Sequence, residues 1–558
     1  MSEIILLKES NCKDCYKCIR HCPVKAISFA ENRAEIIPDE CILCGQCYVV
    51  CPQNAKQIRS DVDKVKAAIR AGKRVVASVA PSFIADFQMG GIEDMEETLK
   101  RLGFAAAEET ALGAELVSRE YERMVREGKQ SVIISSCCPS VNSLIQKYYP
   151  EMLRYLAHVL SPMQAHCKRI REKDPGAYTV FIGPCIAKKG EADESKYTDV
   201  ALTFNELQQW MTDEGIEPVR KEREAKEGVR ARFYPTTGGI LKSMQEETGY
   251  RYMAVDGTEN CMAMLEELQT GEFGKVFIEM SACEGSCING PSIREHRQSR
   301  LKGNLRVDAY AGGADFGVEP LKDISQQFAF RSTHSVQPGR EAIQAVLNQM
   351  GKTTPDKELN CGCCGYPTCR DKAIAVCQGK AVVEMCLPFL KEKAESFSDK
   401  IIGNTPNAIM VLNEDLIVEQ INKAALNMFK LRSADDILHG PVVRMLDPTD
   451  YLNVVTTGRN IYNKCHYVAE YKIFVEETIL YDKQYRILIS IMRDVTDREE
   501  MRKSDLELRR QTAEITDKVI DKQMRVVQEI ASLLGETTAE TKVALTKLKK
   551  SMAENAGE

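Results

Sequence analysis

The pattern of hydrophobic and polar residues changes along the chain, and these changes, together with the cysteine clusters, divide it into five segments. Between residues 61 and 335 short apolar runs alternate with amphipathic stretches, and the clearest runs cover residues 74–80, 131–136, 178–183 and 274–280. This alternation predicts an α/β domain with mostly parallel strands. Each run ends in a loop of small residues with proline or cysteine. Because ligands favour the carboxyl ends of parallel strands, we expect the functional site at these loops.

The pattern changes again near residue 398. Short β-like runs at residues 408–413 and 416–422 precede two longer ones, which predicts a small α+β domain over residues 398–497. Residues 336–397 are helical in pattern, and residues 498–558 are strongly helical with few aromatic residues and no cysteine. The fold prediction is therefore multidomain.

Within the last segment, apolar positions recur every three or four residues and shift once by an extra four-residue step. The stripe runs through Leu508, Thr512, Ile515, Val519, Gln523, Val527, Ile530 and Leu534. This spacing predicts a two-stranded coiled coil with a stutter, and a helix folded back on its own core is the alternative. Gly535 is expected to end the helix, and Thr537 with Glu540 to cap another short one.

Length, charge and composition narrow the class of protein. A chain of 558 residues has room for several domains. Its apolar runs are far shorter than the roughly 20 residues that span a bilayer, and the first residues do not resemble a signal peptide. We therefore expect a cytoplasmic protein without a membrane partner. The net charge of −6 is spread over interspersed acidic and basic residues, which argues against a nucleic-acid binder.

Cysteine is the most informative residue type, with 22 in the chain. A large cytosolic chain keeps its thiols reduced, so clustered cysteines indicate metal ligands. Residues 1–60 contain two matched C-x2-C-x2-C-x3-C-P runs. The first consists of Cys12, Cys15, Cys18 and Cys22, and the second of Cys41, Cys44, Cys47 and Cys51.

These runs resemble bacterial two-cluster ferredoxins, so an α+β ferredoxin-like domain is expected at residues 1–60. The resemblance implies that each [4Fe–4S] cluster takes three cysteines of one run and the last of the other. The implied ligand sets are Cys12, Cys15, Cys18 and Cys51, and Cys41, Cys44, Cys47 and Cys22. Two zinc sites are the alternative, but zinc would not require two four-cysteine runs.

Three loops at the expected strand ends carry further cysteines. They are Ser135-Ser136-Cys137-Cys138-Pro139, residues 183–191 (GPCIAKKGE) and residues 279–290 (EMSACEGSCING). In this order they resemble the three signatures of [FeFe]-hydrogenases, with supporting matches at residues 80–82 and 236–239. The resemblance implies an α/β catalytic core of two lobes over residues 61–335.

The resemblance also implies an H-cluster, which is a [4Fe–4S] cubane joined to a diiron site with CO, cyanide and a bridging azadithiolate. Its cubane ligands would be Cys138, Cys185, Cys283 and Cys287, with Cys287 shared with the diiron site. Lys188 would donate a hydrogen bond to cyanide, and Pro81 and Ser82 would line the diiron site. Cys137 would relay protons; a small buried hydrophobic role is the alternative. The remaining cysteines are expected to fill the core: Cys167, Cys261, Cys363, Cys377 and Cys465.

Several positions depart from the family pattern. Val141 stands where the first signature has tryptophan, and Gly183 and Ser281 stand where catalytic members have methionine. Ala157 stands where the family's usual proton route has a serine. The glutamates of that route should lie just before the first signature, but we do not assign them to Glu120 or Glu122. Changes around a metal site tune its reactivity, and a proton chain fails at a missing link unless water bridges it. We expect slow turnover.

Two further segments complete the chain. Cys361, Cys364, Cys369 and Cys386 form C-x2-C-x4-C-x16-C, which resembles a [4Fe–4S] domain of anaerobic redox proteins at residues 336–397; zinc is the alternative. Residues 398–497 resemble a PAS domain, on residues 403–409, 422–425 and 494–497. An unrelated α+β dimerisation module is the alternative. Residues 498–558 would then be a signalling coiled coil.

The combined prediction is a sensory hydrogenase. It would interconvert H2 and protons slowly and signal through the PAS domain to a kinase or phosphatase, since no kinase or phosphatase motif follows. A redox carrier, hydrogenase maturation proteins and a second copy of the chain are the other expected partners. The alternatives are a metabolic hydrogenase whose PAS domain dimerises it, and a non-catalytic Fe–S redox regulator.

Overall fold

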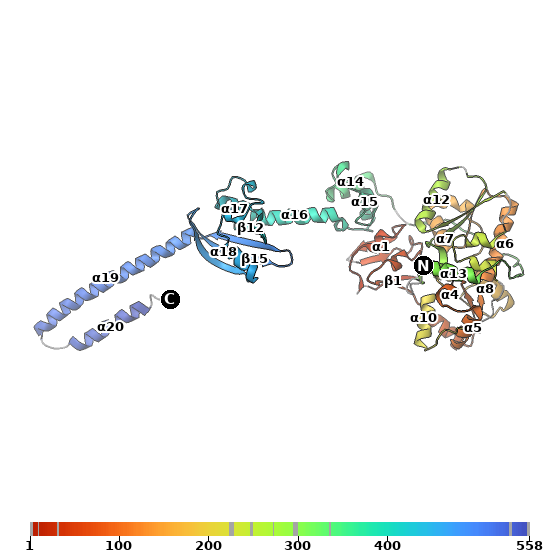
Figure 1. Cartoon of the computed structure of the whole chain (residues 1–558), viewed down its shortest axis with the longest axis horizontal. Helices are drawn as coiled ribbons and strands as arrows, with labels where there is room; N and C mark the ends of the chain where they lie inside the picture. The colour runs from red at the N-terminus through yellow and green to blue at the C-terminus, as the bar shows by residue number, and fades with distance from the viewer. Residues whose placement is uncertain are drawn as a thin grey trace. The chain divides into compact units, whose positions relative to one another are not determined.

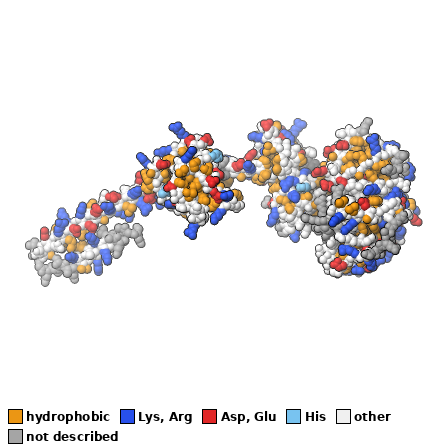
Figure 2. Space-filling model, in the orientation of Figure 1, with side chains coloured by type: hydrophobic (Ala, Val, Ile, Leu, Met, Phe, Trp, Pro, Cys, Tyr) orange, Lys and Arg blue, Asp and Glu red, His pale blue; other side chains and the backbone are white. Residues whose placement is uncertain are grey.

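The computed structural model describes residues 4–8, 11–30, 33–221, 228–245, 249–271, 273–293, 299–333, 336–534 and 538–554. The chain divides into two compact units, Met1–Leu390 and Lys391–Glu558 (Figure 1). On the face shown in Figure 2, acidic and basic side chains are mixed over the surface. Among the described residues, no helix is both long enough and apolar enough to cross a membrane.

The first unit begins with a small α+β subdomain. Strand β1 (Ile5–Leu7) pairs antiparallel with β4 (Lys56–Ile58), and β2 (Ile27–Ala30) pairs antiparallel with β3 (Arg33–Ile36). The helices α1 (Lys17–Arg20) and α2 (Gln46–Val49) each carry a cysteine of one run. The structure thus gives the ferredoxin-like α+β arrangement predicted for this part of the chain.

Two parallel sheets form the following α/β core. One has the order β6-β5-β8-β9, and the other β10-β11-β7. Their strands are β5 (Val75–Val79), β6 (Ala106–Glu109), β7 (Val132–Ile134), β8 (Tyr178–Gly183), β9 (Val200–Thr203), β10 (Arg251–Asp256) and β11 (Val276–Ser281). All four apolar runs of this region form strands, so the predicted parallel α/β fold is confirmed.

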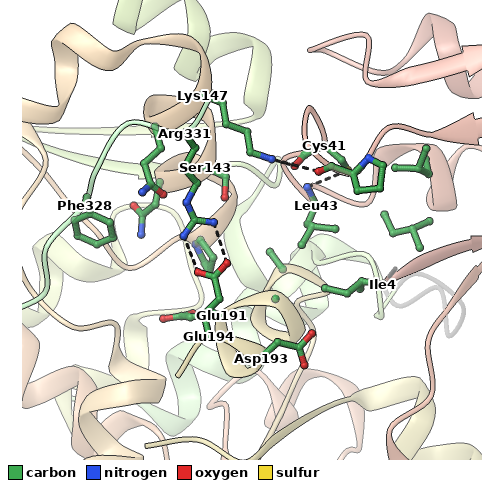
Figure 3. A pocket seen from close by; sticks show the side chains of 18 of the residues that line it. Ile4, Cys41, Leu43, Ser143, Lys147, Glu191, Asp193, Glu194, Phe328 and Arg331 are labelled. Atoms are coloured by element: carbon green, nitrogen blue, oxygen red, sulfur yellow. Dashed lines mark hydrogen bonds and ion pairs between the residues drawn. The ribbon is translucent and has the colours of Figure 1, made fainter. Parts of the chain in front are cut away.

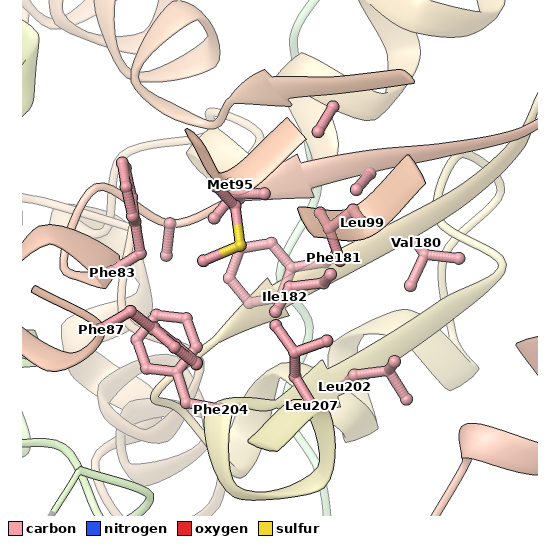
Figure 4. Close-up of a cluster of buried hydrophobic side chains, with 14 of the residues drawn as sticks. Phe83, Phe87, Met95, Leu99, Val180, Phe181, Ile182, Leu202, Phe204 and Leu207 are labelled. Atoms are coloured by element: carbon pink, nitrogen blue, oxygen red, sulfur yellow. The ribbon is translucent and has the colours of Figure 1, made fainter. Parts of the chain in front are cut away.

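Helices pack around these sheets (Figure 1). They are α3 (Val62–Arg70), α4 (Phe83–Asp86), α5 (Ile92–Arg101), α6 (Ala111–Glu127), α7 (Pro139–Tyr148), α8 (Pro162–Lys173), α9 (Ala187–Asp193), α10 (Phe204–Asp213), α11 (Gly239–Ser243), α12 (Thr258–Thr270) and α13 (Arg300–Tyr310). Aromatic and aliphatic side chains such as Phe83, Met95, Phe181 and Leu207 meet over the four-stranded sheet (Figure 4). Their burial removes apolar surface from water and fixes the loops that follow the strands.

A small helical segment packs on the ferredoxin-like subdomain. It contains α14 (Arg340–Gln349) and α15 (Cys369–Cys377). The amide of Phe29 donates to the carbonyl of Lys380 at 2.8 Å, and Lys380 Nζ lies 2.7 Å from a carboxylate oxygen of Glu40. Side chains of both parts share one hydrophobic cluster, so the two cysteine-rich regions are held together.

The second unit contains a five-stranded antiparallel sheet of order β13-β12-β16-β15-β14. The strands are β12 (Ala408–Asn413), β13 (Val418–Ile421), β14 (Ile461–Val468), β15 (Ile473–Asp482) and β16 (Ile487–Asp494). Helices α17 (Lys423–Met428) and α18 (Thr449–Thr457) lie between β13 and β14 in sequence and contribute to its core. The predicted β-like runs therefore form the strands expected of an α+β domain.

Long helices flank this sheet in sequence. Helix α16 (Leu387–Asn404) precedes it, and α19 (Thr496–Leu534) and α20 (Thr538–Glu554) follow it. Lys549 Nζ lies 3.7 Å from Asp517 Oδ1, so α20 turns back along α19. Gly535 and Thr537, the predicted helix stop and cap, lie outside the described residues.

Candidate functional site

A cavity of about 110 Å³ lies where three parallel strands end, and we call it the inner cavity. Cys138 follows β7, Cys185 follows β8, and Cys283 and Cys287 follow β11; all four line this cavity. Cys138 is also the N-cap of α7, whose first residue is Pro139. Proline is suited to that position, so the strand-to-helix turn that orients Cys138 is encoded locally.

Burial controls the chemistry of these thiols. Desolvation raises the pKa of Cys185 to about 11, with a further increase from Cys138. It raises the pKa of Cys283 well above its ordinary value, and Cys185, Cys287 and Cys138 raise it further. The four thiols therefore lie close enough around the inner cavity to affect one another. Since iron binds thiolate, cationic iron is needed to draw the protons off such a group.

Ser82 supplies an independent sign that the inner cavity suits a polar group. Its side chain is fully buried and lines the cavity beside Pro81, yet its hydroxyl has no hydrogen-bond partner. An unsatisfied buried hydroxyl costs about 1–3 kcal/mol, so such a group is expected where a bound ligand completes the pairing. An H-cluster with cyanide ligands fits both this hydroxyl and the four thiols.

Lys188 lines the same cavity and is held by an ion pair. Its Nζ lies 2.6 Å from Glu191 Oε2 and donates to the carbonyl of Cys137 at 3.3 Å. Burial alone would lower the pKa of Lys188, but Glu191 and the nearby thiols Cys185 and Cys137 raise it above its ordinary value. The ammonium group is therefore available to donate to an anionic ligand.

Cys137 lies next to a predicted ligand, and its thiol meets a tyrosine. Its Sγ is 3.2 Å from the hydroxyl of Tyr121, which also accepts from the amide of Ser136. Burial raises the pKa of Cys137 to about 12, so it is a protonated thiol near neutral pH. The contact with Tyr121 gives this thiol, which lines the inner cavity, a polar partner.

The departures from the family pattern have local explanations. A Cβ at Gly183 would lie 2.6 Å from the ring of Phe181, so no methionine fits there without rearrangement. Ser281 instead bonds to Ser286, with the two hydroxyl oxygens 2.8 Å apart. Ala157 is fully buried. Glu120 pairs with Arg123, and the residues that line the inner cavity include neither Glu120 nor Glu122.

The N-terminal cysteines form two groups, each with three cysteines of one run and the last cysteine of the other. Cys12, Cys15, Cys18 and Cys51 line one cavity. In the other group burial raises the pKa of Cys47 well above its ordinary value, and Cys44, Cys41 and Cys22 raise it further. The structure therefore brings together the two sets that the ferredoxin resemblance implied. Backbone amides approach the sulfurs, as from Ala55 to Cys51 at 3.3 Å, and would stabilise thiolates.

The third predicted set, Cys361, Cys364, Cys369 and Cys386, also surrounds a cavity. Within the parts of the chain that the structure describes, no three His, Cys, Asp or Glu side chains are close enough to bind one metal ion together. Lys372 lies beside this cavity, and burial lowers its pKa to about 8.

A larger cavity of about 780 Å³ lies between the ferredoxin-like subdomain and the core, and we call it the outer cavity. Figure 3 shows Arg331 paired with Glu194 in it and Lys147 reaching the Cys41 loop, where Nζ donates to the Cys41 carbonyl at 2.7 Å. Glu191 also lines this cavity. The outer cavity therefore borders both a predicted cluster ligand and the partner of Lys188.

Two residues beside the predicted site, Glu279 and Tyr121, were not predicted from the sequence. Glu279 accepts from the amides of Gly238, Ile240 and Leu241 and holds the start of α11 against the inner cavity. Burial raises its pKa to about 7. Glu279 is the first residue of the third signature, so its position in the sequence could have identified it, whereas no local motif marks Tyr121.

The predicted core-filling role of the remaining cysteines holds only in part. It is consistent with buried Cys167 and Cys261, but it is wrong for three exposed cysteines, Cys363, Cys377 and Cys465.

Three family models match the parts of the chain that carry the cysteine sets. Residues 73–291 match the family model described as iron only hydrogenase large subunit, C-terminal domain. Residues 73–291 belong to the iron-only hydrogenase family. Residues 4–67 match a 4Fe-4S dicluster domain, and residues 358–388 match a model for an Fe–S cluster. The chain therefore joins a hydrogenase core to Fe–S segments on both sides.

Individual relatives are distant. Iron hydrogenase 1 of Clostridium pasteurianum is 25% identical over 370 residues, which are 52% of this chain and 64% of that protein. The chain thus spans less than two thirds of that relative. An [FeFe]-hydrogenase of Chlamydomonas reinhardtii is 18% identical, covering 45% of this chain and 88% of that one with a TM-score of 0.37. A PAS domain of an HTR-like protein from Haloarcula marismortui is 18% identical, covering 18% of this chain and 98% of that one with a TM-score of 0.16.

Proposed function

We propose that this hydrogenase-family chain interconverts H2 with protons and electrons at an H-cluster and uses the reaction to sense H2 or redox state. The observation that carries the proposal is the convergence of four thiols around a cavity that also contains an unpaired hydroxyl, an ammonium group and a protonated thiol. The thiols are those of Cys138, Cys185, Cys283 and Cys287. When bound, the H-cluster supplies the metal centre at which H2 is split or formed.

The remaining groups of the cavity have separate tasks in this proposal. Lys188 would donate a hydrogen bond to an anionic cyanide ligand of the H-cluster, and the Ser82 hydroxyl would find its hydrogen-bond partner on the same cofactor. Cys137 holds a proton on Sγ and exchanges it with the cofactor side of the cavity, while Tyr121 orients the thiol. The lining is largely apolar, so the few polar contacts act in surroundings of low polarity and are strengthened.

Electrons would pass through the Fe–S centres of the first unit. Cys44 lines the inner cavity, so a cluster held by Cys41, Cys44, Cys47 and Cys22 would lie next to the H-cluster site. Cys22 and Cys364 belong to the same hydrophobic cluster of side chains, which brings the third cysteine set close to this relay. We assign [4Fe–4S] clusters to all three sets, so electrons can move between the H-cluster and the cluster at Cys361.

The proposed signal from the third cluster to the PAS-like domain is supported by the chain that joins them. Cys386 directly precedes α16, and the carbonyl of Ile402 near the end of this helix accepts from Asn422 Nδ2 at 2.9 Å. Asn422 caps α17 of the PAS-like domain. A change at the third cluster could therefore bias the PAS-like domain and then α19, which would act on a kinase or phosphatase. A switch of this kind requires two states with different contacts.

We further propose slow turnover, because Gly183 and Ser281 replace methionines and Ala157 interrupts the usual proton route. Film voltammetry tests this: rates equal to those of hydrogen-producing relatives would contradict it. They would favour the alternative of a metabolic hydrogenase in which the PAS-like domain only dimerises the chain.

Infrared spectroscopy of matured full-length protein tests the central claim. The expected spectrum contains bands from CO and cyanide bound to iron, together with measurable H2 uptake or evolution. A protein that carries Fe–S clusters but lacks these bands and both activities would instead be a non-catalytic redox regulator. Cys287→Ser is the matched variant, and it should lose the bands while retaining the N-terminal clusters.

A further inference from the structure

A continuous chain of hydrogen bonds runs from the inner cavity to the protein surface. Thr110, which lines the inner cavity, has its Oγ1 2.8 Å from Ser78 Oγ. Ser78 Oγ is in turn 2.8 Å from His166 Nδ1. The other ring nitrogen, His166 Nε2, is 3.3 Å from Glu108 Oε2. Four side chains from β5, β6, the start of α6 and α8 thus form one connected path.

The two ends of this path lie in different environments. Thr110, Ser78 and His166 are buried, with His166 fully so. The side chain of Glu108 is 37% exposed, and Arg169 Nη1 lies 2.7 Å from its Oε2. The path therefore begins at the cavity wall and ends at a carboxylate that contacts water.

We propose that Thr110, Ser78, His166 and Glu108 conduct protons between the inner cavity and solvent. The proposal rests on the proposed hydrogenase function, which requires protons to enter or leave that cavity. It replaces the usual family route, which is interrupted at Ala157. Cys137 lines the same cavity as Thr110, and the step between them crosses the cavity itself, where water can carry the proton.

Each member has the donor and acceptor capacity that the transfer requires. A hydroxyl accepts on oxygen and donates its own proton, so Thr110 and Ser78 can pass a proton in either direction. A neutral imidazole has one N–H and one acceptor nitrogen. In the outward direction His166 accepts on Nδ1 and releases from Nε2 to Glu108, which passes the proton to water. The ring then returns to its first tautomer, and no net change remains on the chain.

The surroundings of the path set the protonation states of His166 and Glu108. Burial lowers the pKa of His166, so the ring is neutral near neutral pH. The contact with His166, and then Arg169, lowers the pKa of Glu108 to about 2. The carboxylate is therefore ionised, can accept the hydrogen bond from Nε2, and readily releases a transferred proton to water. Glu109 is the other acidic group that acts on His166, and it pairs with Arg232.

The test separates conduction from a structural role by matched substitutions. Thr110→Val removes the hydroxyl at nearly constant volume, Thr110→Ser retains it, and His166→Gln keeps polar contacts but cannot relay. His158→Gln is the control, because this histidine stacks on Phe328 and is not among the residues of the path. All variants are made in full-length matured protein, and the fluorescence of Trp210 reports whether the core remains folded.

The readout is the rate at which the CO and cyanide infrared bands reach new positions after a pH jump, together with H–D exchange under D2. We expect Thr110→Val and His166→Gln to slow both rates by at least about tenfold, since a positioned proton-transfer group contributes about 10²–10⁴-fold. Thr110→Ser and His158→Gln should match the parent protein, and equilibrium band positions should be unchanged.

Rates within twofold of the parent protein in both disruptive variants would overturn the proposal. If neither variant folds, Glu108→Gln is measured instead: it keeps a side-chain oxygen for His166 Nε2 but removes the ionisable acceptor at the exposed end, and rates within twofold of the parent protein would again overturn the proposal. Failure of the proposed function has a different signature, because the parent protein itself would then show no diatomic bands.

Discussion

Lys188 Nζ lies 2.6 Å from Glu191 Oε2, and this ion pair stands between the two cavities of the first unit. Lys188 lines the inner cavity, and Glu191 lines the outer one. Both side chains are nearly buried, with 10% and 11% of their surface exposed. The carboxylate therefore has two roles, because it balances a buried ammonium and keeps it directed at the inner cavity.

Glu191→Gln is expected to destabilise the core strongly. Removing one member of a buried ion pair leaves an uncompensated charge and costs about 3–5 kcal/mol. Urea denaturation followed by Trp210 fluorescence measures this cost, because Trp210 is the single tryptophan and is buried in the core. Glu97→Gln, in an exposed pair with Lys221, is the control and should change little. An equal effect of the two substitutions would contradict the buried-pair account.

The strands and the convergence of the signatures could be predicted from sequence for a physical reason. The apolar run 178–183 forms β8 with the same limits, and the runs before Cys138 and Cys283 become β7 and β11. Parallel strands bring their carboxyl ends to one edge of a sheet, so Cys138 and Cys283, which follow β7 and β11 of one sheet, are expected to meet. Cys185 follows β8 of the other sheet, and its approach to them depends on how the two sheets pack, which the apolar runs do not encode.

The hydrogen-bonded path could not be predicted in the same way. Ser78 and His166 are 88 residues apart, and their contact depends on how α8 packs against β5. Neither residue belongs to a short motif, and a lone histidine gives no periodic signal. The errors at Cys363, Cys377 and Cys465 have a related cause: free cysteine is buried on average, but individual exposure depends on which face of an element packs.

Asp86 should make the stability of the core depend on pH. Neither of its carboxyl oxygens has a hydrogen-bond partner, and burial raises its pKa from 3.8 to about 7. The folded state therefore retains a proton that the unfolded state releases, and stability falls as pH rises from about 4 to about 7 by roughly 4 kcal/mol. Asp86→Asn removes this loss, so it should stabilise the core at pH 8 and have little effect near pH 4.

Urea midpoints of Asp86→Asn at the two pH values check this prediction. The exposed Asp308→Asn serves as the matched control and should not change the pH dependence. If Asp86→Asn shifts the midpoint equally at both pH values, ionisation of Asp86 is not the cause.

Cys369→Ser should remove one complete cluster. Cys369 lines the third cysteine-lined cavity at one end of α15, and the exposed Cys377 lies at the other end of the same helix. Loss of one thiolate from a [4Fe–4S] site should lower the iron content by about four atoms per chain. Cys377→Ser should leave it unchanged. Loss of about one zinc with full retention of iron would identify the site as zinc instead.

The apolar stripe of α19 should bind a second copy of the chain. Leu508, Ile515 and Val519 are 62%, 61% and 53% exposed, although apolar residues at this spacing normally pack into a partner helix. Light scattering after size-exclusion chromatography should therefore give a dimer for the parent protein and a monomer for Ile515→Glu with Val519→Glu. Lys518→Glu, on the same helix but outside the stripe, changes the charge without removing an apolar contact and should remain dimeric. A monomeric parent protein would favour the folded-back arrangement, in which α20 and its Lys549–Asp517 contact cover the helix within one chain.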